Sequence, residues 1–493
     1  MQAGAFSAAS GLRPRRQAAE LAMTTPRRKK YRPWNPESYA DQDFRPADRL
    51  PEGDLVFFLL DTLPQLDLDP FYASYERETR GQPPFDPSLL VCLLLYAYCV
   101  GVYSSRKIAA ACERNLAFLA IVGDDRPDFR TISDFRKGCL EAFADLFTQV
   151  LRLAAEAGLV RLGNLAFDGS KILGQASRHK AMSYGHLKKE DARLRQEIAA
   201  LLQQAQETDA QEDAALGSRR GDELPAELQR REQRLAVITA AKQRLEEQAR
   251  AAADEERRRR AEAEAERQAQ GRKRRGKAPG PVSDVPEDRA QTSFTDPELK
   301  MMKQSNQGWD YSGNAQIGVD ATCQIIVACF VTAAANDQQQ AAPLAQATCA
   351  SLERAGVALP VDAAGRPRKI PATADSGYYS EAAAAELEAA GFDPYLATQR
   401  QKHHEVEAAA PPPPAGATAK ERMAAKVRTP EGRALYARRK VIVEPVFGQI
   451  KAARGFRRFS LRGLSKINGE WRLVCLTHNL LKVWRYGCAS SAN

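Results

Sequence analysis

The sequence contains few histidines and no clustered cysteines. Only five histidines occur among 493 residues, and none has a partner at metal-ligand spacing. The nine cysteines are scattered, mostly within apolar runs, and no Cys-x-x-Cys pair is present. Zinc sites need such clusters of sulfur and imidazole ligands. The pattern therefore argues against a zinc or disulfide framework and favours reduced, buried thiols in a cytosolic protein.

Long apolar segments are also missing. The longest apolar run, LLVCLLLYAYCVGVY from Leu89 to Tyr103, is too short to span a bilayer and lacks the flanks of a signal peptide. It is predicted to be a core helix. No membrane partner is expected.

Aromatic residues make up only 7% of the chain, but a hydrophobic content of 44% is enough for two or three domains with real cores. A net charge of +10 favours a polyanionic partner. Charge alone is a weak argument, because many basic proteins bind no nucleic acid.

The N-terminal third is basic at first and then helical. Residues 1–48 are predicted to be a disordered tail able to contact phosphate. Residues 49–157 repeat apolar side chains at intervals of three and four, which predicts a helical domain. Asp86 and either Thr131 or Ser133 are its expected helix N-caps. Such a domain can bind DNA or serve as a scaffold.

Residues 177–291 form a charged insertion that is predicted to fold as an antiparallel helical hairpin, similar to a coiled coil. Beyond Arg250 no apolar stripe remains, so that part is expected to be frayed or disordered. A second interruption, residues 400–430, is predicted to be a Pro/Ala-rich linker. The apolar residues of the hairpin recur at three, four or seven; they are Leu187, Leu194, Ile198, Leu201, Leu228, Leu235, Ile238 and Leu245.

The remaining segments, 158–176 and 292–484, alternate between strand and helix patterns. A strand (RLGNLAFDGSKI) is followed by a hairpin (AQIGVD and CQIIVACFVT), a helix from NDQQQ onward, a strand (RKIPATAD), a helix and a short strand. This order predicts an α/β fold with an RNase H-like mixed sheet and flanking helices. Fold order by itself does not decide function.

Two of the predicted strands end on an aspartate followed by a turn. AFDGSK places Asp168 in this position, and ATADSGYYS places Asp375. A third acid, Glu444, lies in the helical pattern YARRKVIVEPVFGQIK. A carboxylate at a strand end must be exposed, paired or bound to a metal. Three such acids are what two magnesium ions need for phosphoryl transfer.

The helix around Glu444 groups cations near that acid. At about 100° per residue, Lys451 lies about 20° and Lys440 about 40° from the glutamate, provided that the helix continues through Pro445. Arg439 lies about 140° away and is expected to point to other DNA or to solvent. A carboxylate among cations suits a phosphodiester beside a metal, although an ordinary solvated Lys/Glu pair gives the same spacing.

A basic segment, GFRRFSLRG, follows this helix. Its apolar residues are expected to be buried and so to fix a row of arginines that contacts the DNA backbone. The alternative is an amphipathic turn without a DNA contact. The arginines are Arg457, Arg458 and Arg462, and the apolar anchors are Phe456, Phe459 and Leu461.

Several ordered blocks resemble the DDE transposases of bacterial insertion sequences, of the type with an RNase H-like catalytic domain and a Tyr-Arg-Glu-Lys signature. FDPSLLVCLLLYAYCVGVYSSRKI and RPDFRTISDFRK resemble the helical region of that family. AFDGSKI, DYSGNAQIGVD, ATADSGYYS, VEPVFGQIKAARGFRRFSLRGL and EWRLVCLTHNLLKV resemble its catalytic region. The resemblance covers most of the chain.

The resemblance implies Asp168, Asp375 and Glu444 as ligands of Mg²⁺ or Mn²⁺ and Lys451 as the signature lysine. The signature spacing places Lys440, rather than Arg439, at the arginine position, and Tyr436 is one residue early. The positions expected to contact DNA are Lys171, Tyr436, Arg439, Lys440, Lys451, Arg457, Arg458 and Arg462.

The implied function is a transposase that binds the inverted ends of its element, cleaves a strand with metal-activated water and joins the freed 3′-hydroxyl to target DNA. DNA is the implied partner, a homo-oligomer is expected on DNA, and the implied location is the nucleoid in the cytoplasm. Two alternatives stay open: an RNase H-like nuclease that never joins strands, and an inactive DNA-binding or assembly protein derived from a transposase.

Overall fold

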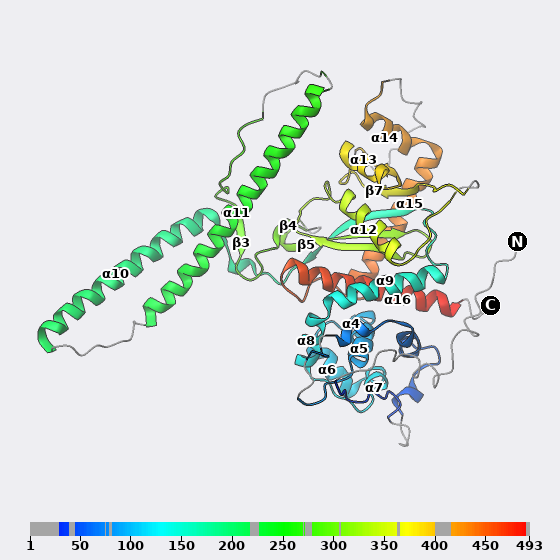
Figure 1. Ribbon diagram of the computed structural model, residues 1–493, viewed down its shortest axis with the longest axis horizontal. Helices are drawn as coiled ribbons and strands as arrows, with labels where there is room; N and C mark the ends of the chain where they lie inside the picture. Colours follow the sequence, from blue (N-terminus) through cyan, green and yellow to red (C-terminus); the bar gives the residue numbers. More distant parts are fainter. Residues whose placement is uncertain are drawn as a thin grey trace. The chain divides into compact units, whose positions relative to one another are not determined.

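The computed structural model describes residues 29–38, 45–73, 75–77, 81–216, 226–269, 271, 279–304, 307–361, 365–399 and 416–489 (Figure 1). The chain forms two compact units. The first consists of residues 1–174 and 312–493, and the second of residues 175–311. Most of the predicted tail, residues 1–28 and 39–44, lies outside the described residues.

The first unit begins with a helical region, as predicted. The apolar run forms α5, in which every residue except Ser88 is buried. Asp86 caps α5 and accepts a hydrogen bond from the Ser88 N–H, which confirms that N-cap. The cap of α8 is Asp128, not Thr131 or Ser133, because its carboxylate accepts the N–H groups of the first turn. The helices are η1 (Pro46–Arg49), α3 (Leu55–Thr62), η2 (Leu63–Gln65), α4 (Asp69–Tyr72), α5 (Pro87–Cys99), α6 (Ser105–Arg114), α7 (Leu116–Val122), α8 (Phe129–Gly138) and α9 (Leu140–Glu156).

A mixed sheet forms the centre of the first unit. Its six strands are β1 (Leu165–Leu173), β4 (Lys300–Lys303), β5 (Trp309–Asp320), β6 (Ile326–Thr332), β7 (Ile370–Ala374) and β8 (Phe392–Leu396). The sheet order is β4-β5-β1-β7-β8, and β6 pairs with β5 outside this path. Strands β6, β5 and β1 pair antiparallel, while β1, β7 and β8 pair parallel. The predicted order of strands and helices is confirmed.

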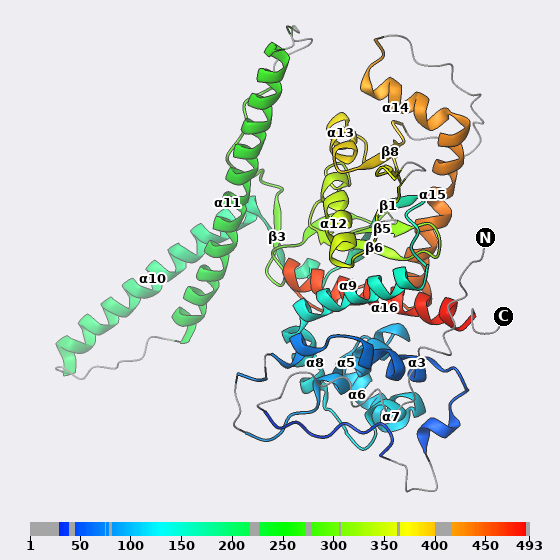
Figure 2. The ribbon, with the colours of Figure 1, turned by 45° about the vertical axis from the view of Figure 1, so that its right-hand side comes forward.

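Helices cover both faces of this sheet (Figure 2). On one face, Phe167 of β1 packs in an apolar cluster with Leu344 of α12 (Ala341–Arg354) and Leu387 of α13 (Glu381–Ala389). On the other, α15 (Pro430–Gly448) packs against β1 and β7. The last helix, α16 (Leu464–Ala489), packs along β6 and α9, which ties the helical region to the sheet.

The predicted linker and one predicted helix start need correction. α14 (Ala419–Arg428) lies within the predicted linker 400–430, where Thr418 and Glu421 form a reciprocal capping box. Residues 400–415 lie outside the described part of the chain. α12 begins at Ala341 rather than at Asn336, so that Asp337 lies in a loop.

The second unit contains the predicted helical pair. α10 (Tyr184–Leu216) and α11 (Ala226–Ala269) pack together through Leu187 and Leu194 on one helix and Ile238 and Leu245 on the other. At the base of the pair, β2 (Ala181–Ser183), just after η3 (Arg178–Lys180), pairs with β3 (Gln291–Ser293). β4 (Lys300–Lys303) precedes the first residues of β5.

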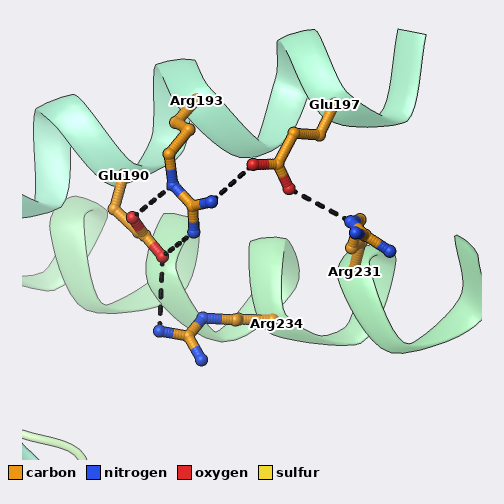
Figure 3. A network of polar contacts seen from close by, with 5 residues as sticks. All are labelled: Glu190, Arg193, Glu197, Arg231 and Arg234. Atoms are coloured by element: carbon orange, nitrogen blue, oxygen red, sulfur yellow. Dashed lines mark hydrogen bonds and ion pairs between the residues drawn. The ribbon is translucent and has the colours of Figure 1, made fainter. Parts of the chain in front are cut away.

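Ion pairs support the helical pair beside its apolar seam. Arg193 bridges Glu190 and Glu197 along α10, while Arg231 and Arg234 of α11 pair with the same two glutamates (Figure 3). The expectation of a frayed segment beyond Arg250 is wrong as far as Ala269, where α11 ends, and residues 270 and 272–278 lie outside the described residues. Arginines there pair with acids three or four residues before them, for example in the pairs Arg257–Asp254 and Arg267–Glu264.

Candidate active site

Two aspartates lie on neighbouring parallel strands: Asp168 lies within β1, and Asp375 directly follows β7. The expectation that the first strand ends at Asp168 and is followed by a turn is wrong, because β1 continues to Leu173 and stays paired with β5 over that length. The parallel register pairs Ala166 with Thr373, and two residues further on it aligns Asp168 with Asp375. The Thr373 hydroxyl donates a hydrogen bond of 3.0 Å to the carbonyl of Leu165, which fixes the two strands together. The two carboxylates therefore lie close together where β7 ends beside β1.

Each aspartate accepts a hydrogen bond from a backbone N–H one or two residues further along the chain. The N–H of Gly169 donates to Asp168 over 2.9 Å, and the N–H of Gly377 donates to Asp375 over 2.8 Å. These contacts hold one oxygen of each carboxylate; the donor to Asp168 lies in the continuing strand β1, and the donor to Asp375 lies in the turn after β7.

The surroundings of Asp168 disfavour its charge. Burial, helped by the nearby carboxylates of Asp375 and Asp337, raises the pKa of this carboxyl to about 7. The Arg439 guanidinium and the Gly169 N–H act in the opposite direction. Crowded acids of this kind are typical of sites that bind a cation or move a proton.

Arg439 is the cation that reaches this pair of acids. Its side chain is buried, and its Nη1 lies 3.7 Å from Oδ2 of Asp168. Tyr436, one turn earlier on α15, lies with its ring 5.9 Å from the guanidinium carbon. The expectation that Arg439 points to solvent or to other DNA is therefore wrong.

The opposite face of α15 carries Glu444 and Lys440. Both residues are exposed, and no hydrogen bond or ion pair within the described ranges joins Glu444 to Asp168 or Asp375. Arg439 rather than Glu444 faces the aspartate of β1. The expectation that Lys451 shares the face of Glu444 is wrong, because the helix becomes π-helical at Gln449 and Lys451 lies against β1. The orientation of α15 could not be predicted from the sequence. Helical periodicity gives the angle between two side chains around the axis, but it does not tell which face of the helix packs against the sheet.

α15 continues without a break through Pro445 because a side chain replaces the missing donor. Proline lacks the N–H that would bond to the carbonyl of Val441, four residues earlier. The side-chain amide of Gln324, in the turn between β5 and β6, donates to that carbonyl over 3.1 Å. The helix then widens into a π-helical turn, Gln449–Ala453 (η4).

The π-helical turn brings Lys451 against β1. Its Nζ donates to the hydroxyl of Ser170 and, over 2.8 Å, to the carbonyl of Lys171. Burial and the nearby Arg457 lower the pKa of Lys451 to about 8, while Asp168 has the opposite effect. Lys451 thus lies near Asp168, and Lys171 contributes a backbone acceptor to this corner.

The basic segment after Lys451 has the predicted amphipathic form. Phe456, Phe459 and Leu461 are buried, and the interleaved arginines Arg457, Arg458 and Arg462 are exposed. The buried Glu470 of α16 holds this segment by accepting the backbone N–H groups of Ser460 and Leu461. The arginines are therefore presented from a fixed loop.

No metal cluster is formed by the described residues. Within those ranges, no three Asp, Glu, His or Cys side chains lie close enough together to hold a metal ion. The donor chemistry at the strand ends nevertheless suits a hard divalent cation, because Asp168 and Asp375 offer carboxylate oxygens whose mutual repulsion a cation would relieve.

Asp337 was not among the predicted site residues. It lies in the loop between β6 and α12, where its Oδ1 accepts hydrogen bonds of 2.7 Å from the amides of both Asn314 and Gln316. The strand of β6 ends several residues earlier, at Thr332, so Asp337 lacks the strand-end pattern that marked Asp168 and Asp375.

In the described part of the chain, no helix is long and apolar enough to cross a membrane.

Comparison with known families gives two matches. A transposase domain model (DUF772) matches residues 44–138, which lie in the helical region, and a transposase DDE domain model matches residues 398–484, which include α15 and most of α16. No curated protein and no solved structure matches the chain.

Proposed function

We propose that this chain, an insertion-sequence DDE transposase by its two family matches, binds the ends of its element and cleaves and joins DNA strands at Asp168 and Asp375. The observation that carries this proposal is that Asp168 within β1 and Asp375 directly after the parallel strand β7 lie close together, beside the buried Arg439. The element order and the mixed sheet are compatible with an RNase H-like catalytic domain.

Asp168 and Asp375 would hold the divalent cation, Mg²⁺ or Mn²⁺. Such a cation supplies an activated water at neutral pH and stabilises charge on the leaving oxygen. Glu444 remains the proposed third ligand on the strength of the resemblance alone, because it is exposed on α15 and has no contact with either aspartate in the described structure.

The cations around the aspartates suit a bound DNA strand. Arg439 balances part of the negative charge of Asp168, and Tyr436 packs beside it. Lys451 is held at Ser170, next to the acids, where its ammonium group can contact a phosphate. The exposed arginines of the loop, together with Lys171 and Lys440, extend the proposed DNA-binding surface.

A joining assay separates this function from its two alternatives. The full-length protein would be incubated with Mg²⁺, a supercoiled plasmid and a short duplex that carries the element end, either uncut or pre-cut to expose the 3′-hydroxyl. We expect cleavage of the uncut end and insertion of the pre-cut end into the plasmid. Cleavage without insertion would instead indicate a nuclease, and binding without either reaction would indicate an assembly protein. A homo-oligomer on DNA is part of the proposal, because joining two ends brings two active sites together.

A further inference from the structure

A set of buried polar side chains lies behind β1. Asn314 and Gln316 of β5 are almost fully buried, with exposed fractions of 1% and 0%. Both donate their side-chain amides to a single oxygen of Asp337. We call these three residues the amide bracket. Buried amides without an acceptor are costly, so the pair depends on Asp337 as its shared acceptor; Asn314 also donates to the carbonyl of Ala334 over 3.2 Å.

The amide bracket lies directly against the backbone of Gly169, the residue that follows Asp168. Gly169 pairs with Gln316 across the antiparallel register, while Asp168 pairs with Ile317. A Cβ atom at position 169 would lie 2.2 Å from Nε2 of Gln316 and 2.7 Å from Oδ1 of Asp337. Neighbouring side chains alternate between the faces of a strand. The bracket therefore supports β1 from the face opposite to that of the Asp168 carboxylate.

The same bracket reaches the segment that follows Asp375. The buried hydroxyl of Tyr378 donates a hydrogen bond to the side-chain oxygen of Gln316. A Cβ atom at Gly377 would lie 3.9 Å from the Cβ of Asp337 and 3.0 Å from the carboxylate of Asp375. One hydrogen-bonded chain thus connects the residues just after both aspartates.

We propose that Asp337 is a positioning residue of the catalytic centre, which sets the separation of Asp168 and Asp375 through the amide bracket. The proposal rests on the proposed function of these two aspartates. Asp337 acts here as the shared acceptor for Asn314 and Gln316, and it does not touch the reacting strand. Without it, the two amides would need other acceptors, and the backbone that follows each aspartate, at Gly169 and at Gly377, would shift.

Two substitutions at this position separate the role of the acceptor from that of the charge. Asp337→Ala removes the acceptor, whereas Asp337→Asn keeps a side-chain oxygen that both amides can reach and removes only the charge. We expect Asp337→Ala to weaken cation binding and cleavage by about ten- to a hundredfold, the usual cost of losing a group that orients metal ligands. Asp337→Asn should stay closer to the wild type than to Asp337→Ala. The exposed neighbour provides a matched control, Gln338→Ala.

Cation binding is measured on the full-length protein without DNA, by electron paramagnetic resonance of Mn²⁺, with Asp168→Asn as the background. Cleavage of the element end is measured as a function of the Mg²⁺ concentration. If Asp337→Ala fails to fold, as judged by circular dichroism, Tyr378→Phe takes its place, because it removes one hydrogen bond of the same chain and keeps the ring. We expect it to weaken Mn²⁺ binding in the same direction.

The proposal would be overturned if a folded Asp337→Ala variant bound Mn²⁺ and cleaved DNA as the wild type does. If Tyr378→Phe is used in its place, wild-type Mn²⁺ binding in that variant would overturn it. So would an Asp337→Asn variant as defective as Asp337→Ala, which would mean that the charge of Asp337 acts directly on the cation. Failure of the proposed function is distinguishable: the wild type would then bind Mn²⁺ at Asp168 but leave the element end uncut, and the bracket would still be judged by Mn²⁺ binding.

Discussion

Arg439 and Lys440 are adjacent basic residues with opposite surroundings. Arg439 is buried beside Asp168, whereas Lys440 is exposed on the far face of α15. Arg439→Ala should therefore reduce cleavage of the element end by about ten- to a hundredfold, because it leaves the carboxylates of the site without their nearest cation. Lys440→Ala should mainly weaken DNA binding and reduce its dependence on salt. Cleavage and gel-shift assays at several salt concentrations measure both effects, and the reverse ranking would contradict this orientation of α15.

Gly169 is the residue at which the strand and the bracket meet most closely. A methyl group at this position would overlap Gln316 and Asp337, so Gly169→Ala should destabilise the fold by about 1–3 kcal/mol and impair cleavage. Gly163→Ala is a matched control, since it adds the same methyl group just before β1, where no atom lies within 4 Å. Urea unfolding measures the difference in stability between the two variants. Equal stability would show that Gln316 and Asp337 move aside at little cost.

At the scale of elements, two acids on neighbouring strands could be picked out from the sequence, but their partners could not. Asp168 and Asp375 are apparent because each follows a short apolar strand pattern and precedes small residues, although β1 does not end at Asp168 but continues to Leu173. The face of α15 that meets β1 depends on packing between distant segments, so Arg439 was assigned to the wrong side. Asp337 was missed because the predicted helix started too early and hid the loop.

The buried histidine of α16 makes the fold sensitive to acid. His478 contacts the carbonyl of Gln324, and burial lowers its pKa from 6.5 to about 3. Below pH 6.5 His478 binds a proton in the unfolded chain but stays neutral in the folded chain. The stability that the neutral, buried His478 allows is therefore fully present above pH 6.5 and is lost as the pH falls toward 3.

The loss amounts to about 1.4 kcal/mol per pH unit in that window. His478→Gln should therefore lose less stability than the wild type between about pH 7.5 and about pH 5. The fluorescence of the buried Trp471, on the same helix, reports urea unfolding at both values. An identical pH dependence in the two proteins would exclude His478 as the cause.

At the scale of the whole molecule, the helical pair carries its own apolar cluster. Tyr184, Leu187 and Leu194 pack with Ile238 and Leu245 inside the second unit. Replacing residues 187–275 by a short Gly/Ser linker should therefore leave the first unit soluble and folded, with β2 and β3 closing the gap.

Circular dichroism and sedimentation of the shortened protein test this expectation. Loss of the folded signal would show that the insertion belongs to the core. A lower oligomeric state on DNA, with poorer joining of two ends, would instead show that the helical pair connects subunits.

The central claim is that Asp168 and Asp375 form the catalytic centre of a transposase, and one measurement tests it directly. Asp168→Asn and Asp375→Asn would be compared with the wild type for Mg²⁺-dependent cleavage of the element end and, in parallel, for binding of the same DNA. Asp124→Asn, an exposed aspartate of the helical region, serves as the control. We predict that both site variants lose cleavage and keep nearly normal binding, because one ligand is lost but few phosphate contacts are. Cleavage near the wild-type rate in either variant would contradict the account.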